Sequence, residues 1–179
     1  MNLPDTERPA TELDPIERLV AIEEIRRLKA RYWRFVDTKQ WDAFGKLFAR
    51  DARFTDHAGG PFHCDGAAEI QSKISAVLEK ALTIHQGHQS EIDIEDASNA
   101  RGIWVMEDYL VFPPGDAHPT NPFPEATVRG YGHYVERYVK IGGEWFFQAV
   151  DLYRLRLEVL SPSGTPYPAV VRGGTAPGA

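Results

Sequence analysis

The hydrophobic pattern of this chain changes its period about halfway along. From Ile16 to Phe35, apolar residues recur at three- and four-residue steps, which predicts one long amphipathic helix. Asp14 followed by Pro15 supports a helix start, because proline suits the first helical position. Later segments lack this phasing and are rich in β-branched and aromatic residues, which predicts four strands at residues 84–94, 100–112, 127–140 and 145–160. Helices followed by strands indicate an α+β fold, with a strongly curved antiparallel sheet around helices packed into its concave face.

Shorter elements complete this pattern. We expect helices at residues 41–48 and 67–82, and a short strand at residues 52–55 before a turn-rich break. Residues 113–126 contain several prolines and glycines and predict a long loop. Loops of this length in compact domains often act as lids over a site.

The size and composition of the chain predict one domain. Its 179 residues are 42% hydrophobic, which suits one sizeable core better than two thin ones. The domain is expected to span residues 15–160. On either side lie a loose polar tail at residues 1–14 and a Pro- and Gly-rich tail at residues 161–179.

The charge and the cysteine content of the chain exclude several kinds of ligand and site. The net charge of −6 argues against nucleic acid or an anionic membrane surface, since both would repel the protein. The sequence has no apolar run near the roughly 20 residues that cross a bilayer, and its N-terminus lacks a signal-peptide pattern. Cys64 is the single cysteine, which excludes an intrachain disulfide and a cysteine-based metal site. We expect a cytoplasmic protein with a small, mostly neutral ligand.

Five polar residues occupy positions where a core residue would be apolar. They comprise a phenol, an imidazole, a guanidinium and two carboxylates, which suffice to move a proton and to hold a polar leaving group. They come from the first helix and three of the strands, and are Tyr32, Asp37, His85, Asp108 and Arg154. This combination predicts an enzyme site.

Asp37 and His85 are the candidates for a catalytic pair. Asp37 follows the last apolar residue of the helix, where the helix dipole disfavours an anion, so a nearby histidine would offset that cost. A solvated aspartate beside Lys39 is the alternative. His85 and His88 are three residues apart and face opposite sides of a strand, and the neighbouring Gly87 weakly favours His85 as the inward one. A structural, hydrogen-bonded ring is the alternative for His85.

Asp108 and Arg154 lie in phase with apolar residues of their strands and are expected to point inward. A buried carboxylate must be paired or functional, and a salt bridge with Arg154 or Arg156 is the structural alternative. An inward guanidinium is a fixed donor suited to a carbonyl or a departing hydroxyl. Tyr32 ends the apolar stripe of the helix, where it is either a core residue or has its hydroxyl at the pocket edge.

The sequence contains no motif for nucleotide binding, serine hydrolase chemistry or zinc binding. The sequence has no GxGxxG after a strand, no P-loop and no GxSxG motif. Its histidines at positions 57, 63, 85 and 88 show no spacing that closes a tetrahedron around zinc. We expect neither a metal nor a cofactor.

Four segments together resemble the SnoaL-like branch of the nuclear transport factor 2-like superfamily. They are AIEEIRRLKARYWRFVDTKQWDAF, IHQGHQSEIDIED, ARGIWVMEDYLVF and GHYVERYVKIGGEWFFQAVDLYRLRLE, within residues 15–158. Within this superfamily the chain is most similar to bile-acid 7α-dehydratase. The resemblance implies a cone-shaped α+β barrel and an Asp37–His85 base for an elimination, with Tyr32, Asp108 and Arg154 beside it. The chain departs from the dehydratase at Asp56, where that enzyme has a second tyrosine, and in its long loop.

The residues and the resemblance predict a cofactor-independent lyase that acts on a hydroxylated aromatic or polycyclic molecule. It would eliminate water, with or without C–C cleavage that releases a small aldehyde such as formaldehyde. An isomerase or cyclase using the same pocket is the alternative, as is a non-catalytic small subunit of a ring-hydroxylating dioxygenase. We expect a homo-oligomer, either a dimer or a trimer. Substrate contacts are expected from Asp56, Asp108, Trp104, Phe54 and His88, and further aromatic pocket residues from Trp33, Phe147 and Tyr153.

Overall fold

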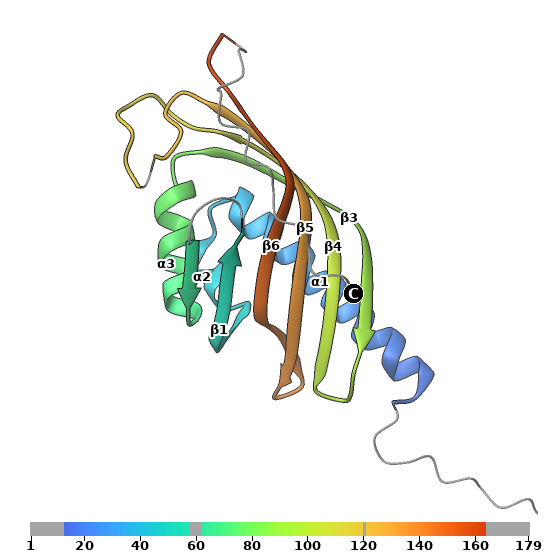
Figure 1. Ribbon diagram of the computed structural model, residues 1–179. Coiled ribbons are helices and arrows are strands. Elements are labelled where there is room, and N and C mark those ends of the chain that lie inside the picture. The colour runs from blue at the N-terminus through green and yellow to red at the C-terminus, as the bar shows by residue number, and fades with distance from the viewer. Residues whose placement is uncertain (1–12, 58–61, 120, 164–179) are drawn as a thin grey trace, which may run out of the picture.

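The computed structural model describes residues 13–57, 62–119 and 121–163, so most of the two predicted tails lies outside the described residues. Helices and strands follow the predicted order, with helices mainly in the first half and long strands in the second (Figure 1). They are α1 (Pro15–Asp37), α2 (Trp41–Gly45), β1 (Phe48–Asp56), β2 (Phe62–Asp65), α3 (Ala67–Leu78), β3 (Leu82–Ile94), β4 (Asn99–Val111), β5 (Thr127–Ile141) and β6 (Glu144–Leu160).

The first helix forms as the sequence predicts. The Asp14 side chain accepts a hydrogen bond from the backbone N–H of Ile16 at 2.8 Å, and Pro15 takes the first turn, where no N–H is needed. At the other end Lys39 adopts a left-handed conformation with φ of 59°, which prevents the helix from continuing. Asp37 is therefore the last helical residue, at the edge of the sheet's concave side.

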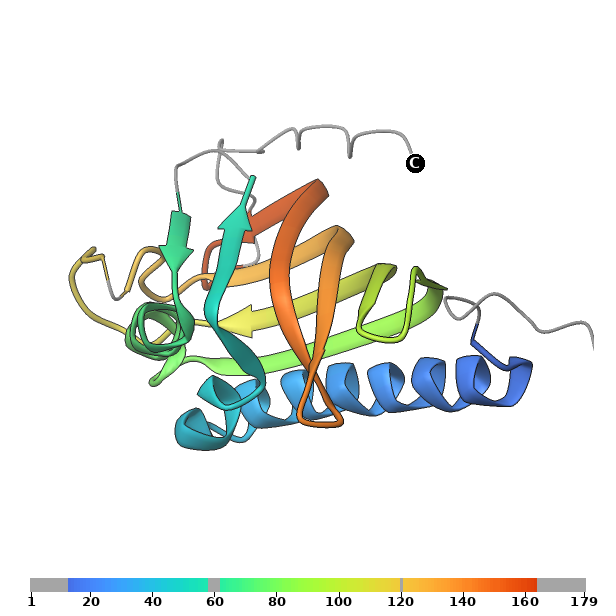
Figure 2. The ribbon, with the colours of Figure 1, turned by 90° about the horizontal axis from the view of Figure 1, so that it is seen from below.

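The strands form one curved, mixed sheet in the order β2-β1-β6-β5-β4-β3. All neighbours are antiparallel except β1 and β6, which run parallel. The predicted α+β fold with helices on the concave face is confirmed, but the sheet is neither wholly antiparallel nor closed into a barrel. Helix α1 lies along the β3 side of the concave face (Figure 2), so a helix rather than a strand covers that side of the core.

Two features between α1 and α3 differ from what the sequence predicted. The second helix ends at Gly45 instead of continuing to residue 48, because Phe48 pairs with Phe147 of β6 and already belongs to β1. The strand β2 was not predicted. It is four residues long and depends on pairing with β1, in which Phe54 faces Cys64, so its own sequence carries little periodic signal.

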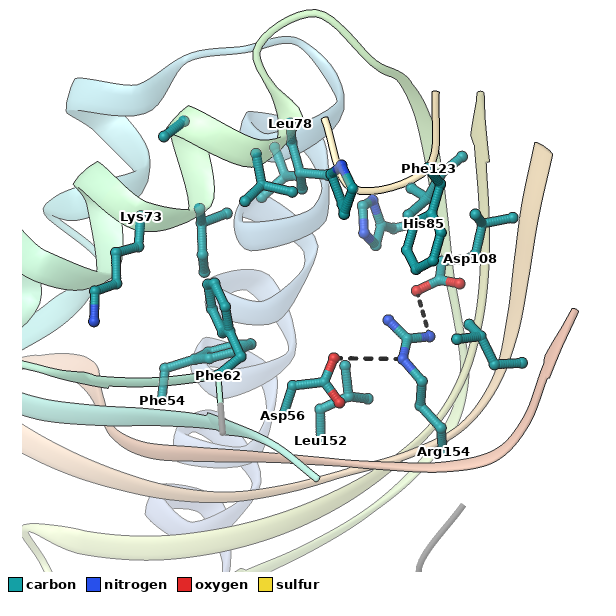
Figure 3. Close-up of a pocket in the computed structure, with 18 of the residues that line it drawn as sticks. Phe54, Asp56, Phe62, Lys73, Leu78, His85, Asp108, Phe123, Leu152 and Arg154 are labelled. Carbon is teal, nitrogen blue, oxygen red and sulfur yellow. Dashed lines mark hydrogen bonds and ion pairs between the residues drawn. The ribbon is translucent and has the colours of Figure 1, made fainter. Parts of the chain in front are cut away.

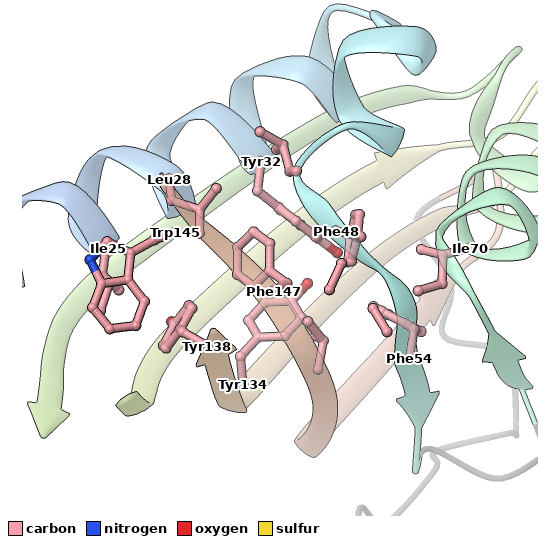
Figure 4. Packing of buried hydrophobic residues seen from close by; sticks show 14 of the residues in the cluster. Ile25, Leu28, Tyr32, Phe48, Phe54, Ile70, Tyr134, Tyr138, Trp145 and Phe147 are labelled. Carbon is pink, nitrogen blue, oxygen red and sulfur yellow. The ribbon is translucent and has the colours of Figure 1, made fainter. Parts of the chain in front are cut away.

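Aromatic rings pack against one another in the larger of two buried clusters (Figure 4). Tyr32 packs edge-to-face on Phe44, Phe147 and Tyr134, with ring centroids 5.2, 5.5 and 6.0 Å apart. The second cluster lies toward the loop of residues 113–126 and comprises Ala81, Leu110, Phe112, Ala126, Val128, Leu157 and Val159. Residues of both clusters line one cavity, so the cavity separates them.

A buried ion pair, unexpected from the sequence, connects α1 to the sheet. Lys29 Nζ lies 2.5 Å from Glu136 Oε1, and both side chains are fully buried. Glu136 also accepts a hydrogen bond from the Tyr138 hydroxyl, which in turn accepts one from Trp104 Nε1 at 2.8 Å. The ammonium group lies 3.5 Å from the centre of the Tyr134 ring, a cation–π contact. Burial lowers the pKa of Lys29 and raises that of Glu136, while their mutual attraction opposes both shifts.

No helix within the described ranges is both long and apolar enough to cross a membrane.

Candidate active site

A cavity of about 540 Å³ lies between α1, α3, the sheet and the loop of residues 113–126 (Figure 3). Its wall is mainly aliphatic and aromatic. The polar groups that reach it are Tyr32, Asp56, Lys73, His85, Asp108, Tyr134 and Arg154. A mostly apolar cavity with a few convergent polar groups is the usual form of a small-molecule site.

Asp37 and His85 meet at one side of this cavity. Asp37 Oδ1 lies 2.6 Å from His85 Nδ1, and Asp37 Oδ2 accepts the backbone N–H of His85 at 2.9 Å. A carboxylate bonded to Nδ1 requires the proton on that nitrogen, which leaves Nε2 as the basic one. His85 lines the cavity and its side chain is 7% exposed. Nε2 is therefore the ring atom available to a ligand.

The local environment keeps Asp37 ionised despite its position at the carboxyl end of α1. Burial raises the pKa of the carboxyl group, but hydrogen bonds from the ring and the backbone of His85 outweigh this and hold the pKa below its ordinary value. A carboxylate that stays ionised can stabilise the imidazolium that forms when His85 takes a proton.

Because the pKa of Asp37 is lowered in the folded protein, its contribution to the free energy of unfolding should depend on pH. A group with a lower pKa in the folded than in the unfolded state stabilises the fold above its unfolded pKa of about 4, and loses that contribution as the pH falls through the folded value. We expect the stability lost in Asp37→Asn to shrink as the pH falls below about 4, where the native carboxyl group also becomes protonated. Urea unfolding at stepped pH measures this loss. Asp42→Asn, which changes an exposed carboxylate, is the control, and a loss for Asp37→Asn that does not shrink in acid would contradict the prediction.

Across the sheet, His85 lies in register with Asp108 on β4, and Asp108 lies in register with Gly130 on β5. Residues directly opposite each other on paired strands present their side chains to the same face. Arg154 on β6 reaches over Gly130, which has no side chain to obstruct it. A Cβ at Gly130 would lie 1.9 Å from Arg154 Nη1 and 2.2 Å from Asp108 Oδ1. Glycine at this position is what allows the arginine and the carboxylate to meet beside the histidine.

Arg154 lies between two carboxylates (Figure 3). Its Nη1 donates to Asp108 Oδ2 at 2.8 Å, and its Nε lies 3.5 Å from Asp56 Oδ2. Burial lowers the pKa of the guanidinium, but the two carboxylates outweigh this and raise it. Of the two salt bridges considered for Asp108, the one with Arg154 forms, whereas Arg156 pairs with Glu158 at 2.5 Å.

Two phenols, Tyr32 and Tyr134, also line the cavity. Burial and the charge of Glu136 raise the pKa of Tyr32 well above its ordinary value, and burial likewise raises that of Tyr134. Both hydroxyls therefore stay protonated and can donate hydrogen bonds. Tyr134 was not among the site residues expected from the sequence. Its phase on β5, two residues from Gly132 and Glu136 on the buried face, is the signal that could have identified it.

Some of the predicted site residues lie elsewhere. His88 is exposed, whereas Trp104 is buried and donates a hydrogen bond to the Tyr138 hydroxyl. Both line a separate hollow rather than the cavity. The register of β3 shifts between Gly87 and Ser90, so the strand's alternation does not carry past that point. Among the predicted aromatic residues, Phe54 lines the cavity, but Trp33, Phe147 and Tyr153 do not.

The sequence interpretation also missed much of the apolar wall. Phe62 on β2 and Leu78 on α3 were not singled out, and the loop of residues 113–126 contributes Pro119, Pro122 and Phe123. Phe123 packs edge-to-face on Phe112, with ring centroids 5.7 Å apart. The loop therefore forms part of the cavity wall. Over the described ranges, no three His, Cys, Asp or Glu side chains gather in a way that could hold a metal ion.

The chain is similar to known proteins in both sequence and fold. The probable cyclase FGR4 of Gibberella zeae is 28% identical over 153 residues, which cover 76% of this chain and 93% of that protein. A protein of Novosphingobium aromaticivorans assigned as a scytalone dehydratase shares the fold with a TM-score of 0.69 at 19% identity, covering 80% of this chain and 90% of that one. A type 2 hexachlorocyclohexane dehydrochlorinase gives a TM-score of 0.71 at 18% identity, covering 87% of this chain and 99% of that one.

A family model confirms the predicted SnoaL-like assignment, while the finer resemblance to bile-acid 7α-dehydratase stays a prediction. The family model described as the SnoaL-like domain matches residues 17–151, which span both α1 and the long strands of the sheet. Because this match covers well over half of the sequence, the chain belongs to the SnoaL-like domain family, with a nuclear transport factor 2-like fold.

Proposed function

We propose that the protein is a cofactor-independent lyase that eliminates water from a hydroxylated aromatic or polycyclic small molecule. The observation that carries this proposal is the Asp37–His85 pair, whose free ring nitrogen is available to a mostly apolar cavity. Such a pair is a general base, and general-base help contributes about 10²–10⁴-fold in rate. The cavity volume of about 540 Å³ is in the range of ordinary small-molecule sites.

In the proposed reaction, His85 Nε2 removes a proton from a carbon next to the one that bears the leaving hydroxyl. The electrons of that C–H bond form a C=C bond, and the C–O bond breaks. The departing hydroxide takes the proton that His85 removed and leaves as water, while the phenols of Tyr32 and Tyr134 donate hydrogen bonds to the developing negative charge. Asp37 stabilises the imidazolium until it gives up its proton.

The same base could act on a hydroxyl proton when the substrate carries a hydroxymethyl group. Removal of that proton would break the neighbouring C–C bond and release formaldehyde. The electrons of the broken bond would then form the C=C bond and expel the hydroxide. This variant needs no additional group from the protein, because the base and the two phenols serve both reactions.

Arg154 takes a different role from the one expected from sequence. We propose that it holds the carboxylates of Asp108 and Asp56 in place, since two of its donors are directed at them. Oxyanion stabilisation would then fall mainly to the phenols. His88 and Trp104 have no direct part in this proposal, because neither lines the cavity.

An isomerase or cyclase is the second candidate. It is supported by the likeness to the probable cyclase FGR4, and it would use the same base and phenols without loss of a group. The paired Asp37 and His85 argue against a non-catalytic subunit, since such a subunit has no need of an oriented base. We also propose a homo-oligomer, either a dimer or a trimer, which light scattering on the purified protein would test.

Mass spectrometry of reaction mixtures tests the proposed function. The protein is incubated with hydroxylated polycyclic and diaryl compounds, including compounds with a hydroxymethyl side chain. A product lighter by one water supports the dehydratase, and one lighter by water and formaldehyde supports the C–C cleavage variant. A product of unchanged mass would replace the lyase with an isomerase. The His85→Ala variant is the control, and conversion by that variant at the normal rate would exclude the proposed base.

A further inference from the structure

The inner polar end of the cavity contains a buried acceptor that the protein itself leaves unused. Asp108 is 1% exposed, and its Oδ2 accepts from Arg154. Its Oδ1 has no hydrogen-bond partner among the residues that the structure describes. A buried carboxylate oxygen without a donor is costly, so a bound molecule that supplies one would gain affinity there.

Negative charges outnumber positive ones among the described residues around this oxygen. Asp56 and Asp108 contribute two negative charges, and Arg154 contributes one positive charge between them. Lys73 is the other cation among the described residues that line the cavity, and it pairs with Glu69 at 2.7 Å. His85, which also lines the cavity, forms a hydrogen bond with the ionised Asp37. Among the described residues that line the cavity, Arg154 is shared by two carboxylates and Lys73 is paired, so neither is left over to neutralise an anionic ligand.

Burial strengthens the effect of this negative charge on a bound ligand. Asp108 lies on the inward face of β4 in phase with Met106 and Leu110, both buried, so little solvent screens it. Arg154 is shared between Asp108 and Asp56, and charges that are screened little by solvent interact strongly with a group placed next to them. A hydroxyl would donate to Oδ1, whereas a carboxylate would meet a like charge after losing its own hydration.

We propose that Asp56, Arg154 and Asp108 form a subsite that accepts a hydroxyl group of the substrate and rejects a carboxylate at the same position. This inference rests on the proposed function in one respect only, that the cavity is where the substrate binds. It selects neutral phenols and alcohols over aromatic acids, and Asp108 is the residue that determines this choice.

Binding of a matched pair of probes tests the inference without any turnover. The probes are biphenyl-4-ol and biphenyl-4-carboxylate, which share a ring system and differ in the polar group. We expect calorimetric titration to show the phenol binding at least about tenfold more tightly to the native protein. Equal or tighter binding of the carboxylate would overturn the subsite. Failure of both probes to bind would overturn the cavity as a site, whereas an inactive enzyme that still discriminates would leave the subsite supported and the lyase refuted.

Three variants identify the residue responsible. In Asp108→Asn the preference for the phenol should fall to about threefold or less, because the negative charge is gone and the carboxylate binds better. Asp56→Asn leaves the bond between Arg154 and Asp108 in place and should also improve carboxylate binding, so the test holds if Asp108→Asn fails to fold. Glu107→Gln removes the same charge from the opposite face of β4 and should leave the preference unchanged. An undiminished preference in both Asp variants would contradict the assignment.

Discussion

Replacing His85 with alanine is expected to lower turnover by about 10²–10⁴-fold while the protein stays folded. The ring is the proposed base, so its removal eliminates proton transfer. The backbone N–H of residue 85 can still donate to Asp37 Oδ2, which keeps α1 attached to β3 in the variant. Steady-state rates and thermal unfolding of the same preparation measure the two effects.

Asp37→Asn should lower turnover to a similar extent, for a different reason. The amide can donate to Nδ1 and so favour the tautomer with its proton on Nε2, which cannot act as a base toward the cavity. The charge that stabilises the imidazolium is also lost. Here we expect a stability loss of about 1–3 kcal/mol, because two hydrogen bonds to a charged acceptor are weakened.

The matched control for the pair is His88→Ala. His88 lies on the same strand, is exposed and does not line the cavity, so its removal should change neither turnover nor melting temperature appreciably. Full activity in His85→Ala, or equal losses in His85→Ala and His88→Ala, would exclude His85 as the base. Loss of folding in both dyad variants would mean that the pair is structural.

Lys29→Met is expected to lower the free energy of unfolding by about 3–5 kcal/mol, because it leaves Glu136 buried without its cation. Glu136→Gln should also destabilise, since Lys29 then loses its counterion. The double variant should be less destabilised than the sum of the two single variants, because neither charge remains in it. Urea unfolding of the four proteins in a double-mutant cycle gives the coupling energy directly.

Acid should partly rescue Lys29→Met. Burial raises the pKa of Glu136, and with its cation gone that rise persists, so protonation of the carboxyl group favours the folded state. The cost of Lys29→Met relative to the native protein should then be smallest below the unfolded pKa of about 4.3, and should grow as the pH rises through the folded pKa of Glu136. Arg27→Met, which breaks the exposed pair with Glu23 on the same helix, is the control and should cost less than about 1 kcal/mol. Equal costs for the Lys29 and Arg27 variants would show that the buried pair contributes no more than an exposed one.

Local periodicity accounts for what could be predicted of the fold. Helix α1 and the strands β3 to β6 are long enough for their patterns to repeat several times, and all of them form within a few residues of the expected bounds. The strand β2 has four residues and the parallel pairing of β1 with β6 joins distant segments, so neither leaves a local pattern. The open sheet likewise depends on where α1 packs, which no single segment encodes.

Phase on strands accounts for what could be predicted of the site. His85, Asp108 and Arg154 were expected to point inward, and all three line the cavity. His88 was also expected to contact the substrate, but alternation from an inward His85 places it on the other face of β3, where it is exposed. Lys29 and Glu136 were missed for another reason. Each alone looks like a solvent-exposed charge, and only their meeting across 107 positions of sequence explains their burial.

Asp37 forms two hydrogen bonds with His85, one to the ring and one to the backbone N–H. The orientation of the catalytic base therefore depends on the position of the carboxyl end of α1. β3 is an edge strand, so the outward N–H of His85 would be open to solvent if the last turn of α1 moved away. One carboxylate holds that amide and the ring together, so both contacts are made or lost as a unit. The fraction of molecules ready for chemistry is then the fraction in which the carboxyl end of α1 is docked. Unfolding of the last turn of α1 alone would then abolish catalytic activity while the sheet stays folded.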